Sequence, residues 1–131
     1  MSSTQRQIPS ILVALLFVIA IVNGLADANH WYWTMRWFDM PMHFSGGVWL
    51  SGMALWWVYF RKDLTPQGFY KILAVSVAFA FGVGLLWELY EAVVGLLTVG
   101  HANALSDTLS DLFFDILGGV AVSGLVWVRS K

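Results

Sequence analysis

Residues 69–99 read FYKILAVSVAFAFGVGLLWELYEAVVGLLTV, an apolar run that two glutamates interrupt. The run exceeds the ~20 residues that a helix needs to cross a hydrocarbon core of ~30 Å. Past Lys71, its only ionisable side chains are Glu88, Tyr90 and Glu91. A carboxylate at membrane depth costs about 2.5–3.5 kcal/mol on insertion scales, so it persists only where the protein compensates it. Because Glu88 and Glu91 are three positions apart, they share one face of a helix, and the same feature must compensate both.

The composition of the whole chain indicates an integral membrane protein. Of its 131 residues, 59% are hydrophobic, which is too many for a soluble domain of this size. Four stretches are predicted to span the membrane: 8–26, 41–60, 69–99 and 109–128. No connection between them is long enough to hold a second domain. The predicted fold class is therefore all-α, with residues 1–131 forming a single bundle of four transmembrane helices.

Basic residues predict the orientation of this bundle. Six of the seven lysines and arginines lie before the first span, between the second and third, or after the fourth, and only Arg36 lies on the other side. The positive-inside rule then places both termini in the cytoplasm and the protein in the cytoplasmic (plasma) membrane. As an alternative, Arg6, the apolar residues 11–22 and the small residues 26–28 together imitate a cleaved signal peptide. We favour retention of this N-terminal segment in the mature protein, because the first apolar stretch is long enough to span the membrane.

Charge and cysteine content exclude several classes of function. The net charge of −1 offers no basic patch for nucleic acid, and the absence of cysteine rules out disulfides, thiolate nucleophiles and soft thiolate metal sites. Residues 27–38 are rich in tryptophan, tyrosine and phenylalanine, which is typical of an interfacial aromatic belt. A lid or lipid-facing rim over a site at the outer surface is the alternative for this segment.

Ionisable side chains from three predicted spans share the outer half of the membrane. They are Asp39, His43, Glu88, Glu91, Asp107, Asp111 and Asp115. Asp39 and Asp107 could also act as simple N-caps of their helices. The three aspartates of the fourth span are four positions apart and therefore form one stripe along a helix. The shared depth follows from an orientation that was assigned from lysine and arginine alone, and it predicts a single site.

Carboxylates with one imidazole form a ligand set for a divalent metal ion. Such a set suits Mn, Mg or Ca, and also Fe or Zn, and paired carboxylates on facing helices build the di-metal sites of helical bundles. All seven side chains are therefore predicted metal ligands. Without a metal, several carboxylates this close could not all ionise, and a proton relay would be the alternative.

Three short motifs resemble those of VanZ-like membrane proteins. In this chain they read Asp39-x-x-x-His43-Phe44, Glu88-x-x-Glu91 and Asp111-x-x-x-Asp115-x-x-Gly118. The Trp87-Glu88-x-x-Glu91 version of the second motif is more similar to a YjdF-like group of small membrane proteins. The extended third motif, from Asp107-Thr108 to Gly118-Gly119, is also more similar to the YjdF-like group. The resemblance covers residues 39–119 and implies a helical membrane architecture.

The VanZ-like family is associated with low-level resistance to a glycopeptide antibiotic and has no established biochemical activity. This chain departs from the family pattern at three points. Glu91 stands where an amide is usual, Asp115 stands where an asparagine is usual, and the arginine expected before the aspartates is absent. These departures make the site more acidic and favour a cation.

Three classes of function follow. The first is a metal-dependent enzyme acting on a lipid-linked phosphate at the outer leaflet, with His43 or a free carboxylate as general base. The second is a non-catalytic membrane protein that a structural cation holds together. The third is proton or cation transport, which ranks last because the inner half carries no ionisable relay and no inverted repeat is visible. The expected partners are membrane lipids and a lipid-linked substrate, and a homodimer remains an open alternative.

Overall fold

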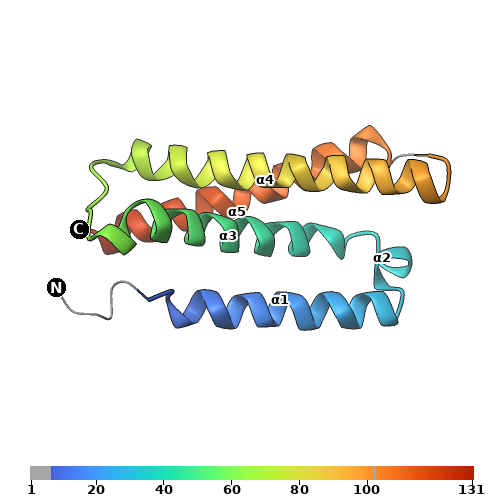
Figure 1. The fold of residues 1–131 in the computed structure, drawn as a ribbon, viewed down its shortest axis with the longest axis horizontal. Coiled ribbons are helices and arrows are strands. Elements are labelled where there is room, and N and C mark those ends of the chain that lie inside the picture. The colour runs from blue at the N-terminus through green and yellow to red at the C-terminus, as the bar shows by residue number, and fades with distance from the viewer. Residues whose placement is uncertain (1–6, 102) are drawn as a thin grey trace.

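The computed structural model describes residues 7–101 and 103–131, and all regular secondary structure within them is helical. Four long helices run side by side along the molecule (Figure 1): α1 (Ser10–Ala28), α3 (Asp39–Val58), α4 (Phe69–Thr98) and α5 (Leu105–Arg129). A short helix α2 (Trp31–Thr34) follows α1, and a 3₁₀ turn η2 (Phe60–Lys62) follows α3. The all-α prediction is confirmed, and α1, α4 and α5 are long and apolar enough to cross a membrane.

Two predicted helix caps are wrong. The N-cap residues are Phe38 for α3 and Ala104 for α5, and neither makes a side-chain capping hydrogen bond. Asp39 and Asp107 instead lie within the first turn of their helices. A carboxylate in the first turn still interacts favourably with the helix dipole, but its side chain remains available for other contacts. For Asp39, those contacts lie inside the bundle.

The aromatic connection between α1 and α3 contains α2, a helix that the sequence pattern did not predict. His30 precedes α2 in the left-handed conformation, with φ of 57°, and it turns the chain back. Phe38 is buried, and its ring centroid lies 5.4 Å from that of Trp31 and 5.2 Å from that of Tyr32. The segment therefore packs partly on itself, while Trp33 and Trp37 remain exposed.

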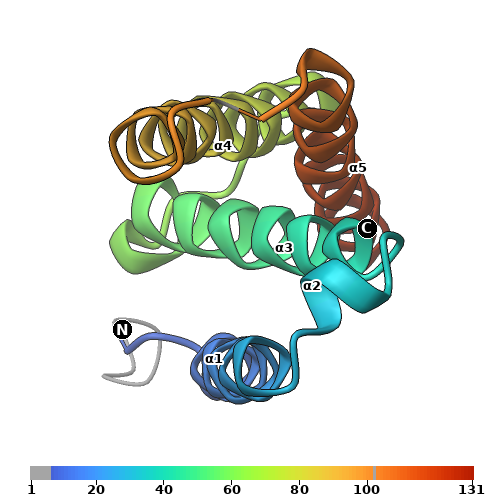
Figure 2. The same cartoon turned by 90° about the vertical axis from the view of Figure 1, so that its right-hand side faces the viewer.

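Helices α3, α4 and α5 pack against one another and form the core of the bundle (Figure 2). Glycines let α3 and α5 approach closely, as small residues commonly do in membrane proteins. A Cβ atom added at Gly118 would meet the carbonyl oxygen of Phe44 and would lie 2.7 Å from the amide nitrogen of Val48. Beyond this contact, toward η2, the hydrophobic core is built on Leu55, Ile72 and Val122.

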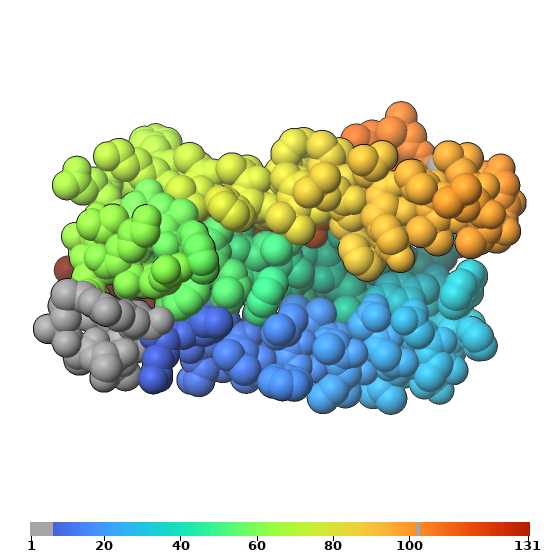
Figure 3. All heavy atoms as spheres, viewed as in Figure 1, coloured from blue at the N-terminus to red at the C-terminus, as the bar shows by residue number. Residues whose placement is uncertain are grey.

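Helix α1 lies outside this core and packs mainly on α3. The indole nitrogens of Trp49 and Trp56 donate hydrogen bonds to the carbonyl oxygens of Leu12 (2.9 Å) and Gln7 (3.0 Å). Figure 3 shows a hollow between α4 and α1, with α3 recessed behind it. Helix α1 begins, and α5 ends, at the η2 end of the molecule, and the opposite end is called the α2 end below.

Candidate metal centre

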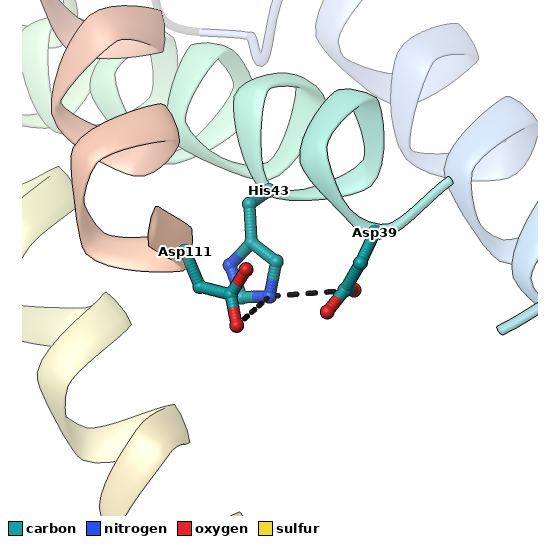
Figure 4. Close-up of side chains that lie close together, drawn as sticks. All are labelled: Asp39, His43 and Asp111. Atoms are coloured by element: carbon teal, nitrogen blue, oxygen red, sulfur yellow. Dashed lines mark ion pairs between the residues drawn. The ribbon is translucent and has the colours of Figure 1, made fainter. Parts of the chain in front are cut away.

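His43 lies in the second turn of α3, at the α2 end, and its imidazole is surrounded by carboxylates from three helices. Its Nδ1 atom lies 3.3 Å from Oδ1 and 3.4 Å from Oδ2 of Asp115. Its Nε2 atom lies 3.6 Å from Asp39 Oδ1, 3.8 Å from Asp111 Oδ2 and 3.9 Å from Glu88 Oε1. Figure 4 shows the carboxylates of Asp39 and Asp111 on two sides of the ring. One imidazole therefore links α3, α4 and α5.

Burial differs across the cluster and gives it an inner and an outer side. The side chains of Glu88, Asp111 and Asp115 are 3%, 6% and 5% exposed, whereas the side chain of Asp39 is 41% exposed. Both carboxylate oxygens of Glu88 are buried and lack a hydrogen-bond partner among the described residues. A buried carboxylate charge is strongly unfavourable unless it is compensated, so Glu88 requires a proton or a nearby cation, which could be a protonated His43 at 3.9 Å or a bound metal ion.

Two glycines make room for Asp115 between the helices. A Cβ atom added at Gly84 would collide with the Asp115 carboxylate, and one added at Gly47 would collide with the Asp115 carbonyl oxygen. These glycines are not among the predicted site residues. Their spacing carried a signal, because Gly84 precedes Glu88 by four residues and Gly47 follows His43 by four. Each glycine therefore lies one turn from a site residue on the same helix face.

The surroundings of His43 favour a role as a metal ligand. Metal-binding histidines commonly donate their other ring N–H to a carboxylate, and Asp115 is placed to accept such a bond from Nδ1. Nε2 then faces Asp39 and Asp111, and one ligand atom from each of these three residues lies within 4.8 Å of the others. Ligand atoms bound ~2.1 Å from one metal lie roughly 3.0–3.4 Å apart, so the two carboxylates and the imidazole would have to draw together to complete a site.

Five of the seven predicted ligands form the cluster, with four carboxylates around His43, and two lie outside it. Glu91 is half-buried and its Oε2 accepts a hydrogen bond of 3.4 Å from Nδ2 of Asn103. Asp107 is exposed, one turn before Asp111 on α5. Neither residue makes an ion pair with the imidazole among the described residues. Asn103 is a polar contact that the sequence analysis did not predict.

Tyr32 is a further polar group at the α2 end, and it lies outside the long helices. Its hydroxyl donates a hydrogen bond of 2.6 Å to Oδ1 of Asn23, which ties α2 to α1. Burial, followed by the negative charges of Asp39, Asp27 and Glu91, raises the pKa of Tyr32 to about 12. Tyr32 therefore remains a neutral hydrogen-bond donor at physiological pH.

The polar groups deeper in the core are serines. Ser51, Ser76 and Ser123 are fully buried, and Ser51 Oγ donates a hydrogen bond of 3.0 Å to the carbonyl oxygen of Ser76. Among the described residues, the buried ionisable side chains are Glu88, Asp111 and Asp115, all of them in the cluster around His43. The described core therefore holds one ionisable cluster, with hydroxyl groups below it.

Fold and site together define a helical membrane protein with a buried carboxylate–histidine cluster. The chain belongs to the family DUF2238, described as a predicted membrane protein, which it matches over residues 2–131. No curated protein and no solved structure matches the chain. The family assignment agrees with the three helices that are long and apolar enough to cross a membrane.

Proposed function

We propose that this protein binds a divalent cation through Asp39, His43 and Asp111 at the outer side of the cytoplasmic membrane. The observation that carries the proposal is the pair of Glu88 oxygens, which are buried without a partner beside His43 Nε2. A cation held by these three ligands would join α3 and α5, and it would offset the charge of Glu88 on α4 beside it. Oxygen-rich ligands with one imidazole suit Mn, Mg, Fe, Zn or Ca.

The proposed site would support hydrolysis or transfer on a lipid-linked substrate of the outer leaflet. A divalent cation supplies polarisation of a phosphoryl oxygen or activation of a water molecule, and three protein ligands leave coordination positions open. Glu88 is the carboxylate best placed to accept a proton, because it is buried, unpartnered and adjacent to the ligand triad. His43 cannot hold a metal and act as general base through the same Nε2 atom, and its contact with Asp115 favours the ligand role.

A four-span topology with both termini in the cytoplasm is part of the proposal. Helix α3 has 20 residues, or ~30 Å, and it packs against α1, α4 and α5, so it would cross the membrane with them. Arg61 and Lys62 lie in η2, and Lys71 and Arg129 lie at the ends of α4 and α5 nearest to it. The positive-inside rule then favours a cytoplasmic η2 end and a site facing the periplasm or the exterior.

The motif positions of the VanZ-like and YjdF-like resemblance support the same site. Asp39, His43, Glu88, Asp111 and Asp115 are motif residues, and they are also the five side chains that converge. Glu91, at which this chain departs from the VanZ-like pattern, lies outside that contact. We therefore propose a shared architecture with those proteins, without their antibiotic association.

Elemental analysis of protein purified without added metal tests the proposal. The expected result is about one divalent ion per chain, lost in both His43→Gln and Asp111→Asn. Asp107→Asn is the matched control, because Asp107 is an exposed carboxylate on the same helix as Asp111, and it should keep its metal. A chelator should lower the melting temperature and added metal should restore it, since a ligand that binds only the native state stabilises it. The proposal would be refuted if the purified protein contained no metal and neither chelator nor added metal changed its melting temperature.

A further inference from the structure

The hollow between α4 and α1 leads from the side of the molecule toward the carboxylate cluster. Helix α3 crosses the molecule obliquely, so at the α2 end its first turns lie behind the gap between α4 and α1 (Figures 2 and 3). Those first turns carry Asp39 and His43. In Figure 4, α4 and α1 lie on opposite sides of the group formed by Asp39, His43 and Asp111.

Three glycines of α3 identify which side of this helix is open. A Cβ atom added at Gly47 would meet Asp115 on α5, and one added at Gly52 would meet the Leu12 side chain on α1. A Cβ atom added at Gly46 would meet nothing within 4 Å. Because Gly46 follows His43 by three residues, the two positions lie ~60° apart around the helix. The open side of α3 therefore adjoins the imidazole.

The depth of the cluster matches that of lipid headgroups. Glu88 lies 17 residues beyond Lys71, or ~26 Å along α4, which is close to the full thickness of a hydrocarbon core. Most side chains of α1 are exposed, and so are many on α4, so lipid surrounds both walls of the hollow in a membrane. A lipid could thus bring its headgroup to the cluster while its chains stay in the bilayer.

Charge selects the kind of headgroup. The carboxylates of Asp39, Glu88, Asp111 and Asp115 outweigh one divalent cation, and Asp107 and Glu91 add negative charge nearby. Arg36 is the only lysine or arginine in the connection on this side. A headgroup with net negative charge would be repelled, whereas an ammonium group would be attracted by the carboxylates that the cation leaves uncompensated.

We infer that the hollow between α1 and α4 admits, from the outer leaflet, a zwitterionic phospholipid whose headgroup carries a primary ammonium group. The phosphate of such a lipid faces the proposed cation, and its ammonium group donates hydrogen bonds to the surplus carboxylates. The inference rests on the proposed cation site and names the class of lipid that reaches it.

Native mass spectrometry of the full chain, loaded with Mn²⁺, tests the inference. The protein is given equal amounts of phosphatidylethanolamine and phosphatidylglycerol with identical acyl chains, and the retained lipids are counted. The expected result is a preference for phosphatidylethanolamine of about tenfold. Gly46→Leu, which fills the open side of α3, should lower retention of phosphatidylethanolamine by about the same factor. Gly124→Leu on α5 is the matched control, since it also adds a side chain to open space, and it should change nothing.

Equal retention of the two lipids, or full retention by the Gly46→Leu variant, would overturn the inference. The preference of the unmodified protein needs no variant, so the test remains decisive if Gly46→Leu does not fold. Metal content is measured on the same samples and reports separately on the proposed function. Protein that binds Mn²⁺ but shows no lipid preference refutes the inference alone, whereas protein without Mn²⁺ refutes the cation site.

Discussion

At the scale of single residues, the two ring nitrogens of His43 have different surroundings, and this difference organises the site. Nδ1 lies against Asp115, whereas Nε2 faces three carboxylates. Glycines on α3 and α4 make room for Asp115. Asp115 therefore orients the ring, and the other carboxylates share the space in front of it. Asp111 and Asp115 therefore have different roles, although their spacing of four residues on one helix gave no reason to distinguish them.

Asp115→Asn should weaken cation binding without removing it. The amide oxygen can still accept a hydrogen bond from Nδ1, but it lacks the charge that strengthens His43 as a ligand. Loss of such a partner typically costs 10–100-fold in metal affinity. Isothermal titration of the metal-free protein with Mn²⁺ measures the effect, and Asp107→Asn serves as the control. If the variant bound Mn²⁺ with the affinity of the unmodified protein, Asp115 would have no role in cation binding.

Glu88→Gln separates a catalytic site from a structural cation. The neutral amide removes a buried charge that has no partner, so the metal-free protein should gain stability, by about 1–3 kcal/mol. The variant should keep its metal, because the triad of Asp39, His43 and Asp111 remains. Loss of function in a complemented deletion strain, with metal content and melting preserved, would support Glu88 as general base. Full complementation would favour the structural cation.

The Tyr32 hydroxyl should lose its proton at a higher pH than an ordinary tyrosine does. Its pKa of about 12 in the folded protein exceeds the ordinary value of 10.0, so the unfolded chain loses this proton first as pH rises. The contribution of Tyr32 to stability is thus complete below about pH 10 and is lost between about pH 10 and 12. The difference in tyrosinate absorbance between the unmodified protein and Tyr32→Phe measures the pKa, and Tyr70→Phe, at an exposed tyrosine, is the control. Titration of Tyr32 near 10 would contradict the buried environment described above.

At the scale of helices, the contact between α3 and α5 depends on close approach of their backbones. Lipid provides no hydrophobic drive that would bring helices together, so association depends on packing and interhelical hydrogen bonds. Gly118 lies against the backbone of Phe44 and Val48, directly beside the residues that hold Asp115. The packing of these two helices therefore also positions the site.

Gly118→Ala should destabilise the bundle by about 1–3 kcal/mol, because the new methyl group would overlap the α3 backbone. Gly124→Ala on the same helix meets nothing within 4 Å, so the better helix propensity of alanine should leave stability unchanged or raise it by up to about 1 kcal/mol. Thermal unfolding in one detergent compares the two variants. Equal effects of both substitutions would show that α3 and α5 do not pack through Gly118.

At the scale of the whole molecule, α3, α4 and α5 form the core, and α1 packs mainly on α3 among the described residues. In this arrangement Asp39 is the member of the cluster that is exposed, whereas the other side chains of the cluster are enclosed by α3, α4 and α5. Because the cluster lies at one end of the bundle, the orientation of the protein in the membrane determines which side the cluster faces. Only molecules on the side of the membrane that the α2 end faces could reach it.

Cysteine labelling tests the orientation, because the chain contains no cysteine of its own. Asn103→Cys, in the loop at the α2 end, should react with a membrane-impermeant maleimide added to intact cells. Ser130→Cys, after α5, should react only once the cells are permeabilised. The reverse pattern would place the carboxylate cluster on the cytoplasmic side and would exclude an outer-leaflet substrate.

The sequence alone determined the helical class and the approximate ends of the four long helices. Both properties depend on local hydropathy and on helix length, which a one-dimensional pattern records. The depth shared by the ionisable residues follows from the same counting along each helix. The alternative role of Asp39 and Asp107 as N-caps is not seen, because a cap depends on where the backbone first becomes helical. Helix α2 was not predicted, and it follows a left-handed turn at His30.

Only the tertiary structure decided which ionisable residues meet. Glu88 and Glu91 share a helix face by spacing, yet Glu88 reaches His43 and Glu91 reaches Asn103. They lie ~60° apart around α4 and almost one turn apart along it, so the rotation of α4 against its neighbours selects one of them. That rotation is set by contacts such as Gly84 against Asp115, between residues distant in sequence. In helices that are apolar on nearly every face, hydropathy does not mark the buried side, and packing alone determines it.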